Sequence, residues 1–517
     1  MASLFVRKSI QDCEQDIRER GGLSRSLNKW HLTALGVGAT IGAGIFAATG
    51  TAIVGDAARP GAGPAIVLSF LLTAVACGFA ALCYAEFAAM VPIAGSAYTY
   101  AYASLGEFVA WIIGWDLIVE YAVGNIGVAI GWSGYFRELV SHFGVTIPAW
   151  LGTDFRSAHD AAAAVAAGAT DPTQTYLASA IADAPRILGI PLIVNLPAFL
   201  VVCAVTIILV RGVRESANSN NAMVLLKIAI ILFFIAVGVY LIKPHNWTNP
   251  ATGGFAPNGF AGISAGAAII FFSYIGFDAV STAAEESKDP KRDMPFGIIM
   301  SLVVCTVLYI GLSAVMTGMA PWKVLGTAEP LITALQYTDG PPALLKASRL
   351  IISLGAVIAM GSVLLVFQLG QPRIFFSMAR DGLLPPFIAK VHPRYKTPWV
   401  GTIITGCFVG GFAAFANIAE VVDLTNIGTL FAFVLVSLGV IVLRYTDPDR
   451  NRPFRAPWVP LTPLISVAAC LYLMRQLPPI TWKRFVIWLV LGLVLYFLYG
   501  ARHSRLRNPE RVRPAVG

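Results

Sequence analysis

Charged residues are scarce in this sequence of 517 residues, because Asp, Glu, Lys and Arg together make up only 13% of it. A soluble globular chain carries about a quarter charged residues and roughly 45–50% apolar ones. This chain is 57% hydrophobic, so it lacks the polar surface that it would need in water. Soluble enzymes, disordered proteins and collagen-like chains are therefore excluded, and a polytopic membrane protein remains.

Signatures of common catalytic and metal sites are absent as well. The sequence has no GxxxxGK[ST] run, which excludes ATP binding by that type of loop. Its seven cysteines lack CxxC-type spacing, so we expect them to be small packing residues rather than metal ligands. The apolar segments contain neither a nucleophile–base pair nor a metal cluster. We therefore expect a protein that is not an enzyme and that needs no cofactor.

Long uncharged apolar runs are abundant. A membrane-spanning helix needs about 20 apolar residues, whereas a membrane β-strand would alternate apolar and polar residues over about ten positions. The runs do not alternate, so helices are predicted. The twelve predicted spans are 32–54, 63–91, 108–135, 190–210, 217–242, 258–284, 296–319, 344–372, 399–417, 424–443, 460–475 and 484–500.

Positive charges divide unequally between the two sides of these spans. With a cytoplasmic N-terminus, 25 of the 37 Lys and Arg residues lie inside and 11 outside, and one lysine falls within a span. Cytoplasmic loops carry such an excess of positive charge. The net charge of +9 therefore predicts a cell-membrane protein with both termini in the cytoplasm, and it does not indicate a nucleic-acid partner.

Two predicted spans contain backbone that is unusual for a membrane helix. The first has GVGATIGAGIF at 36–46, with four glycines in nine residues, and the sixth has FFSYIGFD at 271–278. Unwound backbone at this depth is tolerated only where it lines a cavity or is buried in protein. The alternative for the first span is close helix packing through small residues.

The two irregular segments lie five spans apart, as an inverted five-plus-five repeat requires. Transporters of that architecture bind substrate at the midplane, between interrupted helices in equivalent positions. Free N–H groups of a half-helix in the first span suit a carboxylate, and open carbonyls in the sixth suit an ammonium group. The pair predicts a receptor for a zwitterionic α-amino acid. The candidate contacts are Thr40, Ile41, Gly42, Ala43, Gly44, Phe272, Ser273 and Ile275.

Four stretches also carry a family resemblance: GVGATIGAGIF (36–46), YAEFAAMVPIAGSAYTYAY (84–102), FFSYIGFDAVSTAAEESKDPKRDMP (271–295) and QPRIFFSMARDGLLP (371–385). They resemble the amino acid–polyamine–organocation superfamily, and most of all its cationic amino acid transporter family with bacterial relatives. The resemblance implies an all-α fold of 12 helices, with an inverted-repeat core of the leucine-transporter type and discontinuous helices 1 and 6. The expected division is a cytoplasmic tail (1–30), the ten-helix core (31–445, with an external loop at about 137–189), peripheral helices 11 and 12 (446–500) and a second cytoplasmic tail (501–517).

Lys227 is the lysine left within a span, and its neighbours in NAMVLLKIAIILFF are apolar. An ionisable residue in the bilayer indicates function, and apolar surroundings favour the neutral amine over the ammonium. The resemblance implies that such a lysine occupies the sodium site of sodium-driven members of the fold and bonds carbonyls near Gly38. Proton coupling is predicted, and a permanent ion pair with Glu120 or Asp278 is the alternative.

Other ionisable and bulky residues in the spans are further candidates. Glu120 would attract a cationic substrate side chain or hold an internal hydrogen-bond network. Asp278 would cap the half-helix after the second break. The resemblance implies that Met360 lines the distal end of the pocket, where it would favour small substrates, and core packing is its alternative role. Phe272, Tyr274 and Phe277 are candidates for an aromatic lid or for helix packing. Glu86 with Arg373, Arg380 and Asp381 are candidates for cytoplasmic ion pairs, and ordinary contacts with lipid headgroups are the alternative for the arginines.

The sequence thus predicts a secondary amino acid transporter that works by alternating access, as a proton symporter of neutral or broad specificity. An exchanger or uniporter for cationic amino acids would share the fold and the site. A transport-inactive amino acid sensor is the alternative from a different class.

Overall fold

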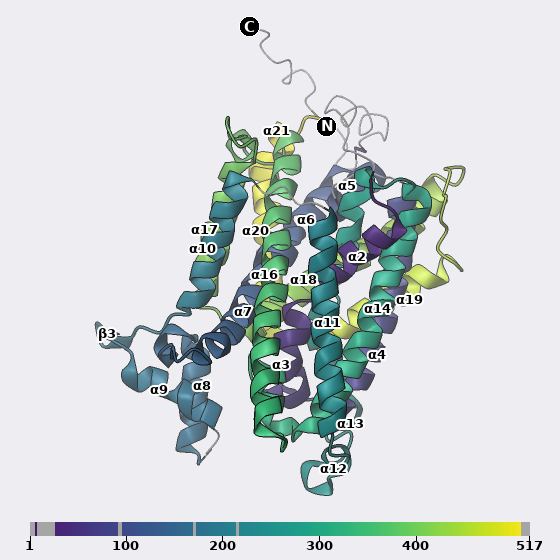
Figure 1. Ribbon diagram of the computed structural model, residues 1–517. Coiled ribbons are helices and arrows are strands. Elements are labelled where there is room, and N and C mark those ends of the chain that lie inside the picture. The colour runs from purple at the N-terminus through teal and green to yellow at the C-terminus, as the bar shows by residue number, and fades with distance from the viewer. Residues whose placement is uncertain (1–5, 8–25, 91–95, 169–171, 213–216, 508–517) are drawn as a thin grey trace.

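Long helices run side by side through the computed structural model, which describes residues 6–7, 26–90, 96–168, 172–212 and 217–507 (Figure 1). Short 3-10 and π-helical segments are labelled η. Up to residue 211 the elements are α2 Lys29–Thr40, η1 Gly44–Ala48, α3 Thr49–Val54, β1 Gly55–Asp56, β2 Arg59–Pro60, η2 Gly63–Ala65, α4 Ile66–Met90, α5 Ser96–Ser104, α6 Glu107–Ile118, η3 Val119–Val123, α7 Gly124–Ser141, η4 Ala149–Leu151, α8 Phe155–Ala166, α9 Pro172–Asp183, β3 Arg186–Ile187, β4 Ile190–Pro191 and α10 Leu196–Arg211.

The elements beyond residue 211 are α11 Ala217–Leu241, α12 His245–Thr248, η5 Pro250–Thr252, α13 Gly259–Ile270, η6 Phe271–Ser273, η7 Asp278–Glu286, α14 Pro290–Met319, η8 Trp322–Val324, α15 Pro330–Gln336, α16 Pro342–Arg380, η9 Pro386–Ala389, α17 Trp399–Ala413, α18 Ile418–Thr446, α19 Leu461–Arg475, α20 Pro479–Leu495, η10 Tyr496–Gly500 and α21 Ala501–His503. Both pairs of strands are short antiparallel hairpins. The prediction of a helical chain is confirmed.

Proline and asparagine mark where several of these helices begin. Proline is favoured in the first turn, because its ring fixes φ and its missing N–H would have no helical partner there. Pro290, Pro330, Pro342 and Pro479 are the first residues of α14, α15, α16 and α20. The Asn28 side chain accepts hydrogen bonds from two N–H groups of the first turn of α2, each at 3.0 Å, and thereby fixes its start.

Eight helices of the described chain are long and apolar enough to cross a membrane, and α2 with η1–α3 forms a ninth span that is bent by 40°. The eight are Gly63–Met90, Glu107–Ser141, Asn221–Leu241, Gly259–Ser281, Pro290–Met319, Pro342–Arg380, Ile418–Thr446 and Pro479–His503. The other three predicted spans coincide with the shorter apolar helices α10, α17 and α19. The chain is therefore a polytopic membrane protein, and all twelve predicted spans fall on helices.

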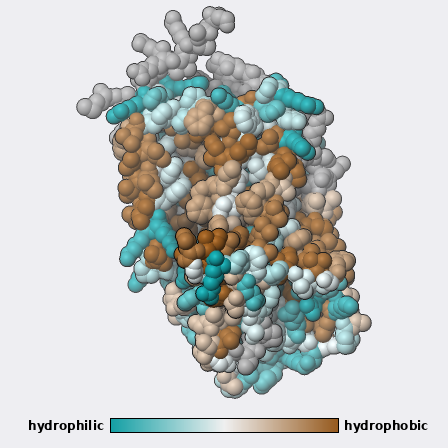
Figure 2. All heavy atoms as spheres, turned by 90° about the vertical axis from the view of Figure 1, so that its left-hand side faces the viewer, coloured by the Kyte–Doolittle hydropathy of each residue, from teal (hydrophilic) through white to brown (hydrophobic). Residues whose placement is uncertain are grey.

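Apolar side chains cover the outside of this bundle. Figure 2 shows hydrophobic residues over the middle of one face, with hydrophilic residues gathered toward its upper and lower ends. Leu225, Val307 and Ile487 are at least 60% exposed although they belong to membrane-spanning helices. Such a surface is unfavourable in water and suits the hydrocarbon of a bilayer.

The predicted external loop at about 137–189 is largely helical where the structure describes it. Helices α8 and α9 pack together and bury a small cluster of their own, formed by Ala149, Ala158, Ala180, Ala184 and Ile193. The hairpin β3–β4 follows, with Arg186 opposite Pro191 and Ile187 opposite Ile190. The Asn417 side chain, just before α18, donates to Ser157 Oγ at 3.1 Å. The segment is thus joined to the main bundle.

The predicted pairing of Glu86 with the arginines after the eighth span is wrong. Arg444 instead donates to the two Glu86 carboxylate oxygens at 2.9 and 2.8 Å, and the Ala456 N–H donates to the same carboxylate at 2.7 Å. The reason is packing: α4 lies against α18, which brings Arg444 to Glu86, and Arg452 Nε also lies 3.5 Å from Glu86 Oε1. The Asp381 carboxylate accepts from the Tyr98 hydroxyl at 2.7 Å.

Candidate functional site

The first span breaks where its glycines are. Helix α2 ends at Thr40, Ile41 has an extended backbone, and helical structure resumes at Gly44. Among the described residues, no side chain caps the start of η1, so its first N–H groups have no side-chain acceptor there. The Thr40 carbonyl accepts from the Tyr309 hydroxyl of α14 at 3.1 Å, and this bond holds the end of α2 in place.

The sixth span breaks between η6 and η7. Helix α13 ends at Ile270, and Gly276 has a φ of +118°, a conformation that side-chain-bearing residues rarely adopt. The Asn426 side chain of α18 donates to the carbonyls of Ala268 and Ile269 at 2.7 and 3.0 Å. It therefore satisfies carbonyl groups at the end of α13, which a break leaves without helical partners.

The two breaks touch each other. A Cβ added to Gly44 would lie 2.3 Å from Ser273 Cα and 2.6 Å from Ser273 N, so only a glycine fits. A Cβ on Gly276 would likewise lie 2.8 Å from the carbonyl carbon of Ala39. The hydroxyls of Thr40 and Ser273 are buried and have no hydrogen-bond partner among the described residues. Uncapped backbone ends and orphaned hydroxyls therefore meet at one point inside the bundle.

Lys227 of α11 lies behind the first break. Its side chain is buried, and Nζ donates to the carbonyl of Gly38 at 2.5 Å, the contact that the family resemblance implies. No ion pair joins Lys227 to Glu120 or to Asp278, although the structure describes all three residues. The alternative of a permanent ion pair is therefore wrong for this structure. Lys227 therefore bonds the helix that ends at the break, without an ion pair to either of these two carboxylates.

Glu120 and Asp278 form a buried carboxyl pair beside the second break. Their side chains neighbour each other, and Thr429 of α18 lies next to Glu120. Glu120 belongs to η3, a π-helical turn in the third span, and π-turns are frequent at functional sites. Asp278 Oδ1 accepts from the Gly276 N–H at 3.3 Å, and its carboxyl also lies against the N–H of Ala279 at the start of η7. These neighbours suit an internal network and the predicted cap.

The three aromatic candidates have different surroundings. The Phe272 ring lies over Gly124 and Gly127 of α7, beside the break. The Tyr274 hydroxyl donates to the Phe70 carbonyl at 3.1 Å, and Phe277 packs edge-on or tilted against Tyr84 and Phe433. Tyr274 and Phe277 therefore contribute to helix packing, and Phe272 remains the candidate for a lid.

Met360 lies beside the first break. A Cβ on Gly131 would be 3.5 Å from Met360 Sδ and 3.4 Å from Ala43 Cβ, so both residues border the same glycine. Met360 is completely buried. Any ligand held at Ala43 would thus have this thioether close to it.

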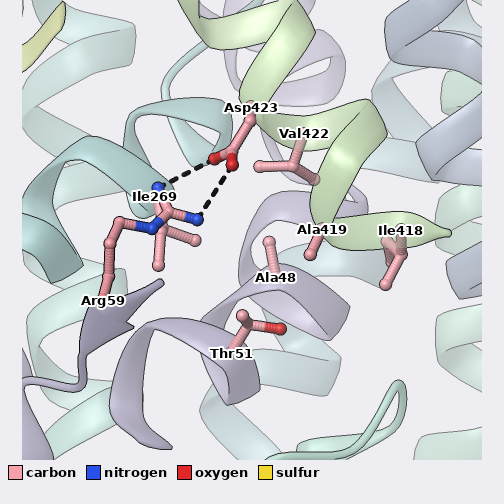
Figure 3. A pocket seen from close by; sticks show the side chains of 8 residues that line it. All are labelled: Ala48, Thr51, Arg59, Ile269, Ile418, Ala419, Val422 and Asp423. Carbon is pink, nitrogen blue, oxygen red and sulfur yellow. Dashed lines mark hydrogen bonds and ion pairs between the residues drawn. The ribbon is translucent and has the colours of Figure 1, made fainter. Parts of the chain in front are cut away.

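Sequence reasoning missed an ion pair near the end of the first span, at the opposite end from its contact with Lys227. Arg59 of the β1–β2 hairpin lies 2.9 Å from Asp423 of α18 (Nη1 to Oδ1) and donates to Asp56 at 2.8 Å. Figure 3 shows the Arg59–Asp423 pair at the edge of a small pocket between η1–α3, α13 and α18. The pocket is lined by Ala48, Thr51, Arg59, Ile269, Ile418, Ala419, Val422 and Asp423. The signal available in the sequence was an aspartate immediately before the tenth predicted span (424–443).

Comparison with known proteins bears on the whole chain. A family model described as amino acid permease matches residues 27–497. A methylthioribose transporter of Bacillus subtilis is 44% identical over 508 residues, covering 98% of this chain and 100% of the relative. A branched-chain amino acid permease of the same organism is 45% identical over 507 residues (98% and 99% covered).

A more distant relative is the vacuolar cationic amino acid transporter 4 of Arabidopsis thaliana, 37% identical over 452 residues, covering 87% of this chain and 68% of the relative. The resemblance predicted from four short motifs is therefore confirmed over almost the full length. These relatives are transporters and permeases rather than enzymes. With a matching family model, matching relatives and a bundle of apolar helices, the chain belongs to the amino acid permease family of the amino acid–polyamine–organocation superfamily.

Proposed function

We propose that this permease is a secondary active transporter that carries neutral amino acids, or a broad range of them, together with protons by alternating access. The observation that carries the proposal is the contact between the two helix breaks at Gly44 and Ser273, with Lys227 bonded to the helix that ends there. One structural unit then links a substrate site to a group that can bind a proton.

The proposed substrate site uses the two breaks for the two charges of an amino acid. The carboxylate would bind the N–H groups between Thr40 and Gly44, where η1 lacks a side-chain cap and the helix dipole is favourable. The ammonium would bind the carbonyls of Phe272, Ser273 and Ile275. Orphaned hydroxyls at Thr40 and Ser273 support this placement, because buried polar groups are normally hydrogen-bonded.

We further propose that α10, α17 and α19 also cross the membrane, which gives twelve spans. The first and last described residues support an even number: the Glu107 N–H donates to the Val6 carbonyl at 3.0 Å, and Arg507 Nε lies 3.0 Å from the Glu107 carboxylate. Both ends of the described chain therefore lie on one side, which nine crossings alone do not allow. At 1.5 Å per residue, the 15-residue α17 spans about 22 Å, which a locally thinned bilayer accommodates.

This count fits the inverted five-plus-five repeat with two peripheral helices, and the division of the chain at about residues 30, 445 and 500. The charge asymmetry of the sequence supports the cytoplasm as the shared side of both ends. Most of the predicted N-terminal tail (1–5 and 8–25) and the end of the C-terminal tail (508–517) lie outside the described residues.

Lys227 is the proposed proton carrier. Its ammonium form donates to the Gly38 carbonyl, so loss of the proton weakens a bond that holds α2. Transport requires two states of comparable free energy. A proton that binds one of them more tightly biases the equilibrium by that difference in binding free energy.

The direct test uses purified protein in proteoliposomes. Uptake of a radiolabelled branched-chain amino acid is measured against a panel of neutral and cationic competitors, at two external pH values and with or without sodium. We expect neutral competitors to inhibit, acid outside to stimulate and sodium to have no effect. Flux only in exchange for internal amino acid would indicate an exchanger, and binding without flux a sensor, and either result would contradict the proposal.

Met360 provides a prediction about substrate size. Met360→Ala should enlarge the pocket beside Ala43, so the kcat/KM ratio of phenylalanine to alanine should rise by about tenfold, as methylene-scale changes in apolar pockets do. Met316→Ala, also fully buried but in α14, controls for general loosening of the core. An equal change of this ratio in both variants would show that Met360 does not line the substrate pocket.

The Arg59–Asp423 pair gives a prediction about gating. We propose that it holds the outer ends of spans 1 and 10 together when the site is closed to the outside. In Asp423→Asn, Arg59 keeps Asp56 as partner, so folding should survive. A membrane-impermeant thiol reagent added outside should then modify Ala48→Cys about fivefold faster or more, the lower end of typical coupling between two states.

The matched control for this experiment is Asp339→Asn, which removes an exposed ion pair with Lys243 away from the pocket. It should leave the labelling rate of Ala48→Cys unchanged. Equal labelling rates in the Asp423→Asn and parent proteins would show that the pair does not close the outer side.

A further inference from the structure

A small apolar hairpin projects from the bundle just before α10. Its strands are Arg186–Ile187 and Ile190–Pro191, and the side chains of Ile187, Leu188 and Ile190 are 60%, 98% and 67% exposed. A two-stranded hairpin of this length is not stable alone in water, and three exposed aliphatic residues at its tip mark a contact surface. The proposed transport function assigns no role to it.

The position of the hairpin identifies what it meets. Figure 1 shows it reaching sideways from the bundle, at a level between the two ends of the membrane-spanning helix α16. It leads directly into α10, whose outward face exposes Leu200, Ile207 and Ile208. Because α16 has 39 residues and is much longer than the hydrocarbon core, a feature that extends sideways at this level is within reach of the membrane interface. Its apolar tip therefore continues the lipid-facing surface of α10.

The hydrogen-bonding needs of its backbone limit how deeply the hairpin can lie in the membrane. Two strands leave two open edges, and open edges do not occur in the hydrocarbon region because their N–H and C=O groups would lack partners. Arg186, which is also exposed, needs water or phosphate groups. We propose that the hairpin lies in the interfacial layer of the leaflet on the α8–α9 side, with Leu188 toward the acyl chains and Arg186 toward the lipid phosphates.

The hairpin is connected to the segment that it would anchor. The Leu192 N–H donates to the Pro185 carbonyl and the Val194 N–H to the Trp150 carbonyl, each at 2.8 Å, and Ile193 packs into the cluster under α8 and α9. Lipid contact at the tip therefore fixes the position of the two-helix segment, which itself contacts α18 through Ser157 and Asn417.

The test measures depth with spin labels on the full-length protein in lipid nanodiscs. Cys13, Cys203 and Cys407 are replaced by serine, and single labels are placed at Leu188→Cys and, in a second protein, Ile190→Cys. Ile208→Cys on α10 is the lipid-facing reference, and Asp160→Cys on the exposed side of α8 is the aqueous reference. The collision rates of the spin label with O₂ and with a water-soluble nickel chelate are measured at each site.

We expect the hairpin labels to collide more with O₂ than with the nickel chelate, as at Ile208, and the order to reverse at Asp160. Nickel accessibility at both hairpin sites equal to that at Asp160 would place the hairpin in water and overturn the proposal. Immobile labels shielded from both reagents would mean that another protein chain covers the tip, which overturns it as well. The readout needs no transport, so it is independent of the proposed function.

Discussion

Replacing Lys227 by alanine is expected to abolish proton-driven accumulation of substrate. For one proton per substrate, a gradient of one pH unit supports at most about tenfold accumulation, because each 1.4 kcal/mol is a factor of ten. Lys227 is buried, bonded to Gly38 on the first span and not paired with a carboxylate of the described residues. Without the Lys227 amine, the proton has no binding site beside the first span. The ratio of internal to external substrate should therefore fall to about one.

The measurement is uptake into proteoliposomes with an imposed pH gradient, and substrate binding to the purified variant is recorded beside it. The variant leaves the Gly38 carbonyl unsatisfied, which costs about 1–3 kcal/mol, so thermal unfolding is followed as well. Lys243→Ala, which removes an exposed lysine outside the spans, should accumulate substrate normally. Undiminished accumulation at low external pH in Lys227→Ala would refute the proposed coupling.

Gly44→Ala is expected to have the second large effect. The new Cβ would lie 2.3 Å from Ser273 Cα and 2.6 Å from Ser273 N, and neither backbone atom can rotate away. Spans 1 and 6 must separate, so the binding groups on the two breaks move apart. Displacements of about 1 Å at a site can lower the rate about 100-fold, and we expect a loss of kcat/KM of this size in the uptake assay.

Gly411→Ala is the matched control, because no other atom of the described residues lies within 4 Å of a Cβ added to this glycine of α17. The change should leave transport intact and stabilise the helix by about 0.5–1 kcal/mol, the helical preference of alanine over glycine. Normal transport by Gly44→Ala would mean that the close contact of the breaks has no part in the site.

Several features of the site are visible in the sequence because they depart from an otherwise apolar pattern. Long hydrophobic runs are interrupted by the glycines at 36–44, by the segment around Gly276 and by the lone charge of Lys227. Such interruptions can be recognised from the neighbouring residues in the sequence alone. The contact of Lys227 with Gly38 is present as expected. The roles of these residues stay predictions until the variants are measured.

The partners of these residues could not be read in the same way. Asn426 and Tyr309 support the two breaks from α18 and α14, and Arg59 meets Asp423 across 364 residues of sequence. Glu86 was assigned to the wrong arginines, because the pairing depends on which helix α4 packs against. Membrane helices are apolar on most faces, so the pattern within one helix does not indicate its neighbours.

The sequence by itself determined that the chain spans a membrane, where its helices lie and where two of them break, because hydrophobicity and glycine act on the local backbone. Only the tertiary structure decided that the breaks meet at Gly44 and Ser273 and that Arg59 binds Asp423. It also decided that Lys227 bonds a carbonyl and pairs with neither Glu120 nor Asp278. The physical reason is that these contacts depend on the packing of helices that are remote in sequence, and close packing is a property of the whole bundle.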